Sequence, residues 1–99
     1  MEYLIRTAGG MAPLLVHLDQ FREVLDPKGF GTQVLPNSPD GDFRLLVGPA
    51  EAMFYAEDVG WQVVIEGEFP EDSSDDLVRT VALQLEQATG AKTTWSRLS

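Results

Sequence analysis

The sequence predicts an α+β fold: a single, mainly antiparallel sheet with two helices packed on one of its faces. Short stretches with apolar residues at every second position, separated by turn residues, predict strands. Two longer stretches repeat apolar residues at helical spacing instead. Their order along the chain, β-α-β-β-β-β-α-β, is typical of helices gathered on one side of a sheet. An elaborated ferredoxin-like sandwich is one arrangement with this layout.

The 99 residues predict one small domain, residues 1–99, with a single core. The composition, 43% hydrophobic and 23% charged, is that of a folded globular protein. The chain contains no cysteine, which excludes disulfides, thiol catalysis and zinc–thiolate sites. The N-terminus has no basic segment before an apolar one, and no apolar run is long enough to span a bilayer. We therefore expect a cytoplasmic protein that does not bind membranes.

The first half of the chain predicts a strand over 3–7 and a helix that ends at Asp26-Pro27-Lys28-Gly29, where proline and glycine both break it. A weak strand over 31–35 and a turn-rich loop over 36–42 follow. The helix would bury one apolar stripe, consisting of Met11, Leu14, Leu15, Leu18, Phe21 and Leu25.

The second half predicts strands over 43–47, 52–57 and 61–69, with a hairpin turn at Asp58-Val59-Gly60. Pro70 ends the last of these strands. Ser73 or Ser74 would cap the second helix, and Gly90 would end it in a left-handed conformation. A closing strand over 93–98 carries Trp95. The apolar stripe of this helix consists of Leu77, Val78, Val81, Ala82, Leu85 and Ala88.

The net charge of −9 is concentrated in the second third of the chain. Residues 45–78 contain nine acidic residues and no basic one, whereas residues 1–44 contain six acidic and four basic residues. Direct binding of nucleic acid needs a basic surface and is disfavoured. The same field favours a basic protein partner. The alternative is that the acidic residues only keep a small protein in solution.

No pattern in the sequence predicts catalysis, a metal site or a cofactor. His17 is the only histidine, and no nucleophile or further metal ligand accompanies it. Asp40 and Asp42 around Gly41 lack the later ligands of a calcium loop. The acidic run before Leu77 is explained by capping and by the dipole of a helix start. We therefore expect a protein that is not an enzyme.

The interpretation that remains is a non-enzymatic, acidic protein-binding module. An inhibitor or immunity protein that neutralises a basic, nuclease-type protein is one such case. Aromatic residues carry much of the energy of protein interfaces, and Phe54 points away from both of its neighbours. The alternative is a ferredoxin-like domain that senses a small ligand near Gly9-Gly10, or that forms a homo-oligomer. The expected partner-binding residues are Glu57, Asp58, Glu66, Glu68, Phe54 and Tyr55.

Overall fold

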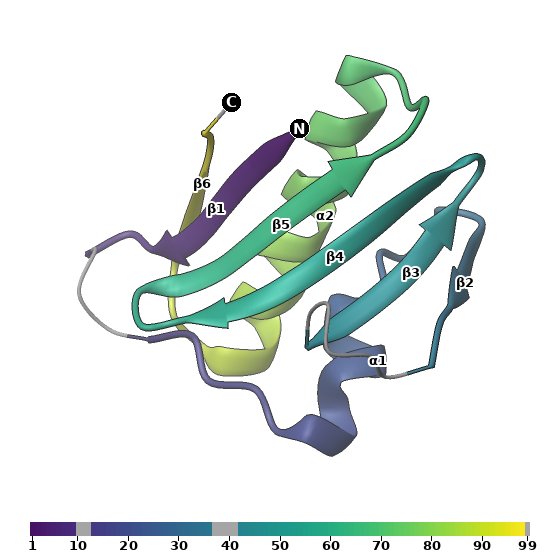
Figure 1. The fold of residues 1–99 in the computed structure, drawn as a ribbon. Helices are drawn as coiled ribbons and strands as arrows, with labels where there is room; N and C mark the ends of the chain where they lie inside the picture. Colours follow the sequence, from purple (N-terminus) through teal and green to yellow (C-terminus); the bar gives the residue numbers. More distant parts are fainter. Residues whose placement is uncertain (10–12, 37–41, 99) are drawn as a thin grey trace.

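A computed structural model describes residues 1–9, 13–36 and 42–98 of the chain. One six-stranded antiparallel sheet forms the protein, with the helices on one side of it (Figure 1), which confirms the predicted fold class. The helical segments are a short 3-10 turn η1 (Leu18–Gln20), α1 (Phe21–Leu25) and α2 (Glu71–Thr89). The strands are β1 (Glu2–Thr7), β2 (Thr32–Val34), β3 (Phe43–Val47), β4 (Ala50–Glu57), β5 (Gly60–Glu66) and β6 (Thr93–Arg97).

The strand order across the sheet is β2-β3-β4-β5-β1-β6. Strands β2 to β5 follow one another as antiparallel neighbours, and β1 lies between β5 and β6. Helix α2 therefore connects two strands that have a third strand between them, which is a split βαβ unit. The path from β1 contains a short helix and two additional strands before β4, and the ferredoxin-like assignment is not confirmed.

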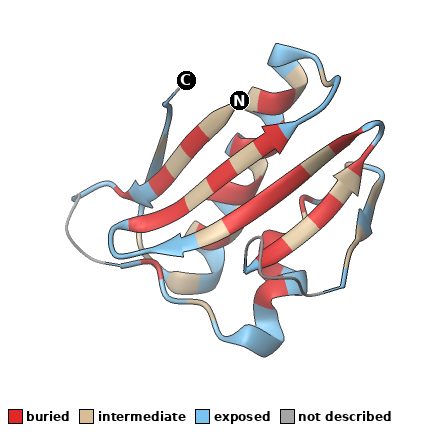
Figure 2. Cartoon of the chain, in the orientation of Figure 1, coloured by how far each residue is buried: buried red, intermediate tan, exposed pale blue. Residues whose placement is uncertain are grey.

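The core lies between the sheet and the helices. Alternate residues of β1, β3 and β5 are buried on the helical side of the sheet (Figure 2). In β4 the alternation is interrupted, because Met53 is buried as well as Ala52 and Phe54. Trp61 is 1% exposed and meets the Phe21 ring edge-on, with ring centroids 5.3 Å apart. Leu77, Val78, Val81, Ala82 and Leu85 of the predicted α2 stripe are buried, but Ala88, its last member, is exposed near the end of the helix.

The first helix is much shorter than its apolar repeat predicted. Only Phe21–Leu25 is α-helical, after the turn η1, and residues 13–17 are not helical. The indole nitrogen of Trp61 donates a hydrogen bond, 2.9 Å long and buried, to the backbone carbonyl of Leu14. An α-helix would use that carbonyl for its own hydrogen bonds, so the tertiary contact replaces the local one.

The predicted stripe of this segment is accordingly divided. Leu14, Phe21 and Leu25 are buried, but Leu15 and Leu18 are 79% and 78% exposed. Met11 lies outside the described residues. A helix would have put these residues on one side, whereas a chain that is extended up to His17 turns alternate side chains outward.

Helix α2 begins three or four residues earlier than the predicted cap at Ser73 or Ser74 implies. Its N-cap is Pro70, and no side chain caps it, so neither Ser73 nor Ser74 has the predicted role. Ser74 is instead fully buried in the helix, and its hydroxyl has no hydrogen-bond partner within the described residues. Glu71 and Asp72 are the acidic residues of the first turn, where negative charge is favourable. The predicted left-handed end at Gly90, with φ 77°, is confirmed.

The hairpin between β4 and β5 is confirmed at Asp58 and Val59. Gly60 follows with φ 154°, and a Cβ atom there would lie 1.9 Å from the carbonyl oxygen of Ile5. Glycine is therefore required where β1 and β5 meet. At the other end, β5 stops at Glu66 and not at residue 69, because Gly67, with φ 100°, bends the chain away. None of the helices in the described ranges could cross a bilayer, by length and apolarity.

Candidate interaction surface

The helices leave one side of the sheet uncovered, and we call this side the open face (Figure 1). The strand register identifies its residues, because those that alternate with the core positions must point the other way. Two rows cross its centre: Leu4 beside Gln62 and Tyr55, and Val64 beside Met53 and Arg44. The open-face residues from β1, β3, β4 and β5 are Glu2, Leu4, Arg6, Arg44, Leu46, Glu51, Met53, Tyr55, Glu57, Gln62, Val64 and Glu66.

The centre of the open face is apolar. Met53 is only 6% exposed, although no helix covers it, because its neighbours on the sheet surround it. Leu4, Tyr55 and Val64 around it are half-buried. The Tyr55 hydroxyl lies 3.8 Å from the sulfur of Met53. An apolar strip of this kind on an uncovered sheet can lose further water only against another molecule.

Two carboxylates face each other on the same surface. Glu51 and Glu66 are direct cross-strand partners, and like charges in this relation repel. Arg44 binds one of them: its guanidinium lies 3.0 Å from Glu51. Glu66 has no ion pair within the described residues, so the open face retains an uncompensated negative charge beside the pair.

The predicted acidic residues form two groups. Glu57 and Asp58 lie at the β4–β5 turn, whereas Glu66 and Glu68 lie at the far end of β5. Seven residues of β5 separate the groups, about 20 Å of extended chain. All four are exposed, and none has an ion pair in the part of the chain that the structure describes. The apolar strip therefore lies between two negative ends.

The aromatic candidates separate in the same way. Tyr55 is on the open face, as an interaction residue must be. Phe54 is fully buried, paired with Phe43 and Val63 on the helical side of the sheet. Phe54 does point away from Met53 and Tyr55, as the sequence predicts, but it points into the core and not toward a partner. It has no accessible surface and does not belong to the candidate site.

The acidic residues at the start of α2 have a structural role. Arg97 of β6 binds Asp75 with 2.8 Å contacts to both carboxylate oxygens, and it also pairs with Glu71. The Arg97 guanidinium, followed by the Tyr3 hydroxyl, holds the pKa of Asp75 below its usual value. Burial, with help from Asp75, raises the pKa of Tyr3 to about 12. This cluster joins β6 and β1 to α2, and its charges are already paired.

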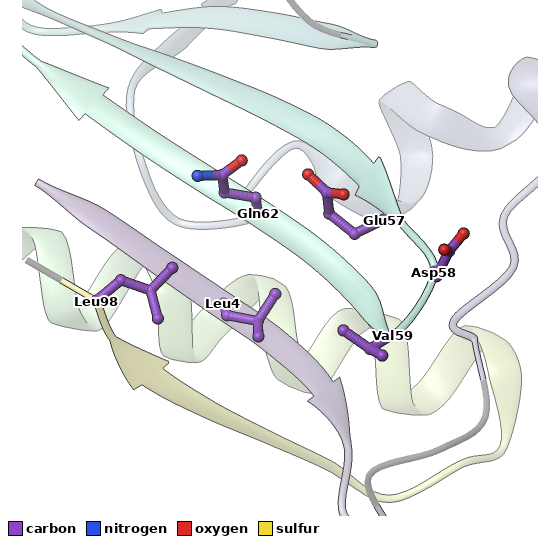
Figure 3. A pocket seen from close by; sticks show the side chains of 6 residues that line it. All are labelled: Leu4, Glu57, Asp58, Val59, Gln62 and Leu98. Atoms are coloured by element: carbon purple, nitrogen blue, oxygen red, sulfur yellow. The ribbon is translucent and has the colours of Figure 1, made fainter.

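A groove of about 330 Å³ opens beside the β4–β5 turn (Figure 3). Leu4 and Gln62 from the centre of the sheet form part of it, and the hairpin turn and the chain after β6 complete it. The lining residues are Leu4, Glu57, Asp58, Val59, Gln62 and Leu98. Sequence reasoning found Glu57 and Asp58 but missed the others. Leu4, between the buried Tyr3 and Ile5, was the available signal, since an apolar residue there gives β1 a second apolar face.

The other candidates do not come together. His17 is exposed, and its ring lies 3.7 Å from the carboxylate of Asp19. Across the described ranges, no three histidine or acidic side chains are close enough to hold a metal ion. Gly10 and Asp40, on which the phosphate and calcium interpretations depended, lie outside those ranges.

The fold and this surface define a class of protein, a small α+β domain with one uncovered sheet face. Comparison with family models, with curated proteins and with solved structures gives no significant match. A function must therefore be inferred from the residues of this chain.

Proposed function

We propose that the protein is a non-enzymatic binding module that docks a basic protein on its open face. The observation that carries the proposal is the apolar strip around Met53, which lies between two exposed acidic groups that form no ion pair within the described residues. Apolar area of this kind supplies the affinity of an interface, and charges at its edge supply the rate and the selectivity of encounter.

Ion pairs within the chain reduce the number of carboxylates that a partner can bind. Among the described residues, Glu51, Glu71, Asp75 and Asp76 form ion pairs with arginines of the chain. Glu57 and Asp58 at one end of the open face, and Glu66 and Glu68 at the other, form no ion pair within the described residues, so a partner's lysines and arginines would replace water there. A second copy of the chain is a poor occupant, since each copy carries a net charge of −9. An inhibitor or immunity protein that covers the cationic surface of a nuclease is the case we favour.

The test begins with capture of partners by the purified protein, followed by reconstitution with each purified candidate. Association rates are then measured at increasing concentrations of sodium chloride. We expect the rate to fall steeply with salt, because exposed charges are screened. Reversing Glu66 and Glu68 to lysine should slow association and flatten that dependence. Tyr55→Ala should act differently and mainly speed dissociation, because it removes contact area.

The matched control reverses Asp19 and Glu23 to lysine. Both residues are exposed and lie in the helical layer, and the net charge changes by the same amount. The control should associate at nearly the parent rate. Equal rates and equal salt slopes for the parent and the Glu66→Lys/Glu68→Lys variant would leave the acidic ends with a role in solubility only. A dimer in light scattering, disrupted by Met53→Asp, would identify a second copy as the occupant and contradict the proposal.

A further inference from the structure

The groove beside the β4–β5 turn has an apolar floor and a polar rim. Leu4, Val59 and Leu98 line up along one side of it (Figure 3). Val59 and Leu98 are 37% and 52% exposed, so the apolar side of the groove is open to water. Gln62 and Glu57 point outward along the opposite side (Figure 3). A ligand for this groove must therefore be apolar along its length and polar at its end.

The charge at the rim is negative and has no counterion. Glu57 and Asp58 are both exposed and form no ion pair within residues 1–9, 13–36 and 42–98. Arg6 lies on the neighbouring strand opposite Gly60, the residue that pairs with Glu57, yet it binds neither carboxylate. The rim can thus accept a cation from outside the chain.

We propose that this groove receives the side chain of an arginine from the basic partner. The three apolar residues would cover the methylene groups of the arginine, which side chains of this type bury readily. The guanidinium would donate to the carboxylates of Glu57 and Asp58 and to the amide oxygen of Gln62. Only arginine has enough donors in a fixed plane to serve three acceptors, and its guanidinium is more weakly hydrated than an ammonium group. The inference rests on the proposed function and assigns a specific subsite to it.

The experiment uses N-acetyl-arginine amide as the probe and records the backbone amide signals of the isotope-labelled protein by NMR. We expect saturable shifts at Leu4, Val59, Gln62 and Leu98. N-acetyl-citrulline amide has nearly the same shape without the charge, and it should bind roughly tenfold more weakly, the equivalent of one charge-assisted hydrogen bond. Absence of saturable shifts at these residues, or equal binding of N-acetyl-lysine amide, would overturn the proposal.

Matched variants locate the site. Glu57→Gln/Asp58→Asn keeps the shape of the rim and should weaken the arginine probe roughly tenfold. Glu66→Gln/Glu68→Gln removes the same charge at the other end of β5 and should leave the probe's affinity nearly unchanged. Arg6→Gln should strengthen binding, because it removes a nearby positive charge. Equal weakening by the two acidic double variants would mean that the probe responds to net charge, and it would contradict the groove assignment.

The two proposals can fail separately. If reversal of Glu66 and Glu68 slows association with the partner but the arginine probe does not enter the groove, the basic partner docks without this subsite. If the probe binds in the groove and association shows no salt dependence, the subsite exists and the docking role of the acidic ends is wrong. Thermal unfolding of every variant confirms that the fold is retained.

Discussion

Tyr3 is a buried phenol at the point where β1, β6 and α2 meet. Its hydroxyl donates a 2.7 Å hydrogen bond to Asp75, whose carboxylate Arg97 also binds. The aromatic ring of Tyr3 lies against Trp95, with centroids 5.9 Å apart, and under the Arg97 guanidinium. Burial raises its pKa, because the phenolate would lose its water, and the adjacent Asp75 carboxylate raises it further.

The titration of Tyr3 is therefore a residue-scale test. Tyr55→Phe leaves Tyr3 as the only tyrosine, and the ultraviolet absorbance of tyrosinate should then rise at about pH 12 and not at 10.0. A pKa that is raised in the folded state stabilises the protein below the unfolded value and ceases to do so as pH rises through the folded one. The urea midpoint of this variant should thus fall between about pH 10 and about pH 12.

Asp75→Asn provides the control. It removes the negative charge beside the phenol but leaves the phenol buried, so the pKa of Tyr3 should move down and stay above its ordinary value. A midpoint near 10.0 in the Tyr55→Phe protein would mean that the hydroxyl is open to water and that the contact with Asp75 is not formed.

At the scale of elements, α2 is the long helix that packs on the sheet. Its buried side includes Leu77, Val81 and Leu85, each fully buried, while Leu83 is 52% exposed on the other side. Gln84 connects α2 to α1, because its side-chain amide donates hydrogen bonds to the backbone carbonyls of Val24 and Asp26, at 2.8 and 3.0 Å. The second helix thereby fixes the C-terminal end of α1.

Leu85→Ala should lower the free energy of unfolding by about 2–5 kcal/mol, the usual range for a truncated core leucine. Leu83→Ala is the matched control and should change it by less than about 0.5 kcal/mol, as for other surface substitutions. Urea denaturation followed by circular dichroism gives both values. Equal costs at the two positions would show that α2 does not pack on the sheet through this side.

The whole molecule carries its negative charge unevenly. Arginines pair with Glu71, Asp75 and Asp76 of α2, whereas the exposed carboxylates at the two ends of the open face form no ion pair within the described residues. Glu66 lies directly opposite Glu51, and like charges in this relation are destabilising.

Salt should therefore stabilise the isolated protein. Sodium chloride screens the repulsion between exposed carboxylates, so the urea midpoint should rise with its concentration. In Glu66→Gln/Glu68→Gln the midpoint should start higher and rise less. A parent midpoint that does not respond to sodium chloride would mean that the free carboxylates are too far apart to interact, and the idea of a strained acidic surface would be wrong.

Part of the candidate site could be read from the sequence, and part could not. Glu57, Asp58 and Glu66 were placed correctly on turns and outer strand positions, because alternation assigns each strand residue to one of two faces. Which face is the core is a global property. Phe54 and Tyr55 are adjacent aromatic residues that point to opposite faces of the sheet. Phe54 is buried and Tyr55 is not, because the helices pack on the Phe54 side.

The sequence by itself determined the fold class, most of the strands, the β4–β5 hairpin and the helix that ends at Gly90, because period, turn residues and caps are local signals. Tertiary structure alone decided three things. The buried hydrogen bond from the Trp61 indole to the Leu14 carbonyl takes the place of helical hydrogen bonding there, and residues 13–17 are not helical. The strand order brought β1 between β5 and β6, which set Leu4 beside Leu98 and Val59 in one groove. Ion pairs from Arg97 decided that Glu71 and Asp75 are bound within the chain. The physical reason is the same for all three: these contacts join residues far apart in the chain, and local sequence pattern carries no information about them.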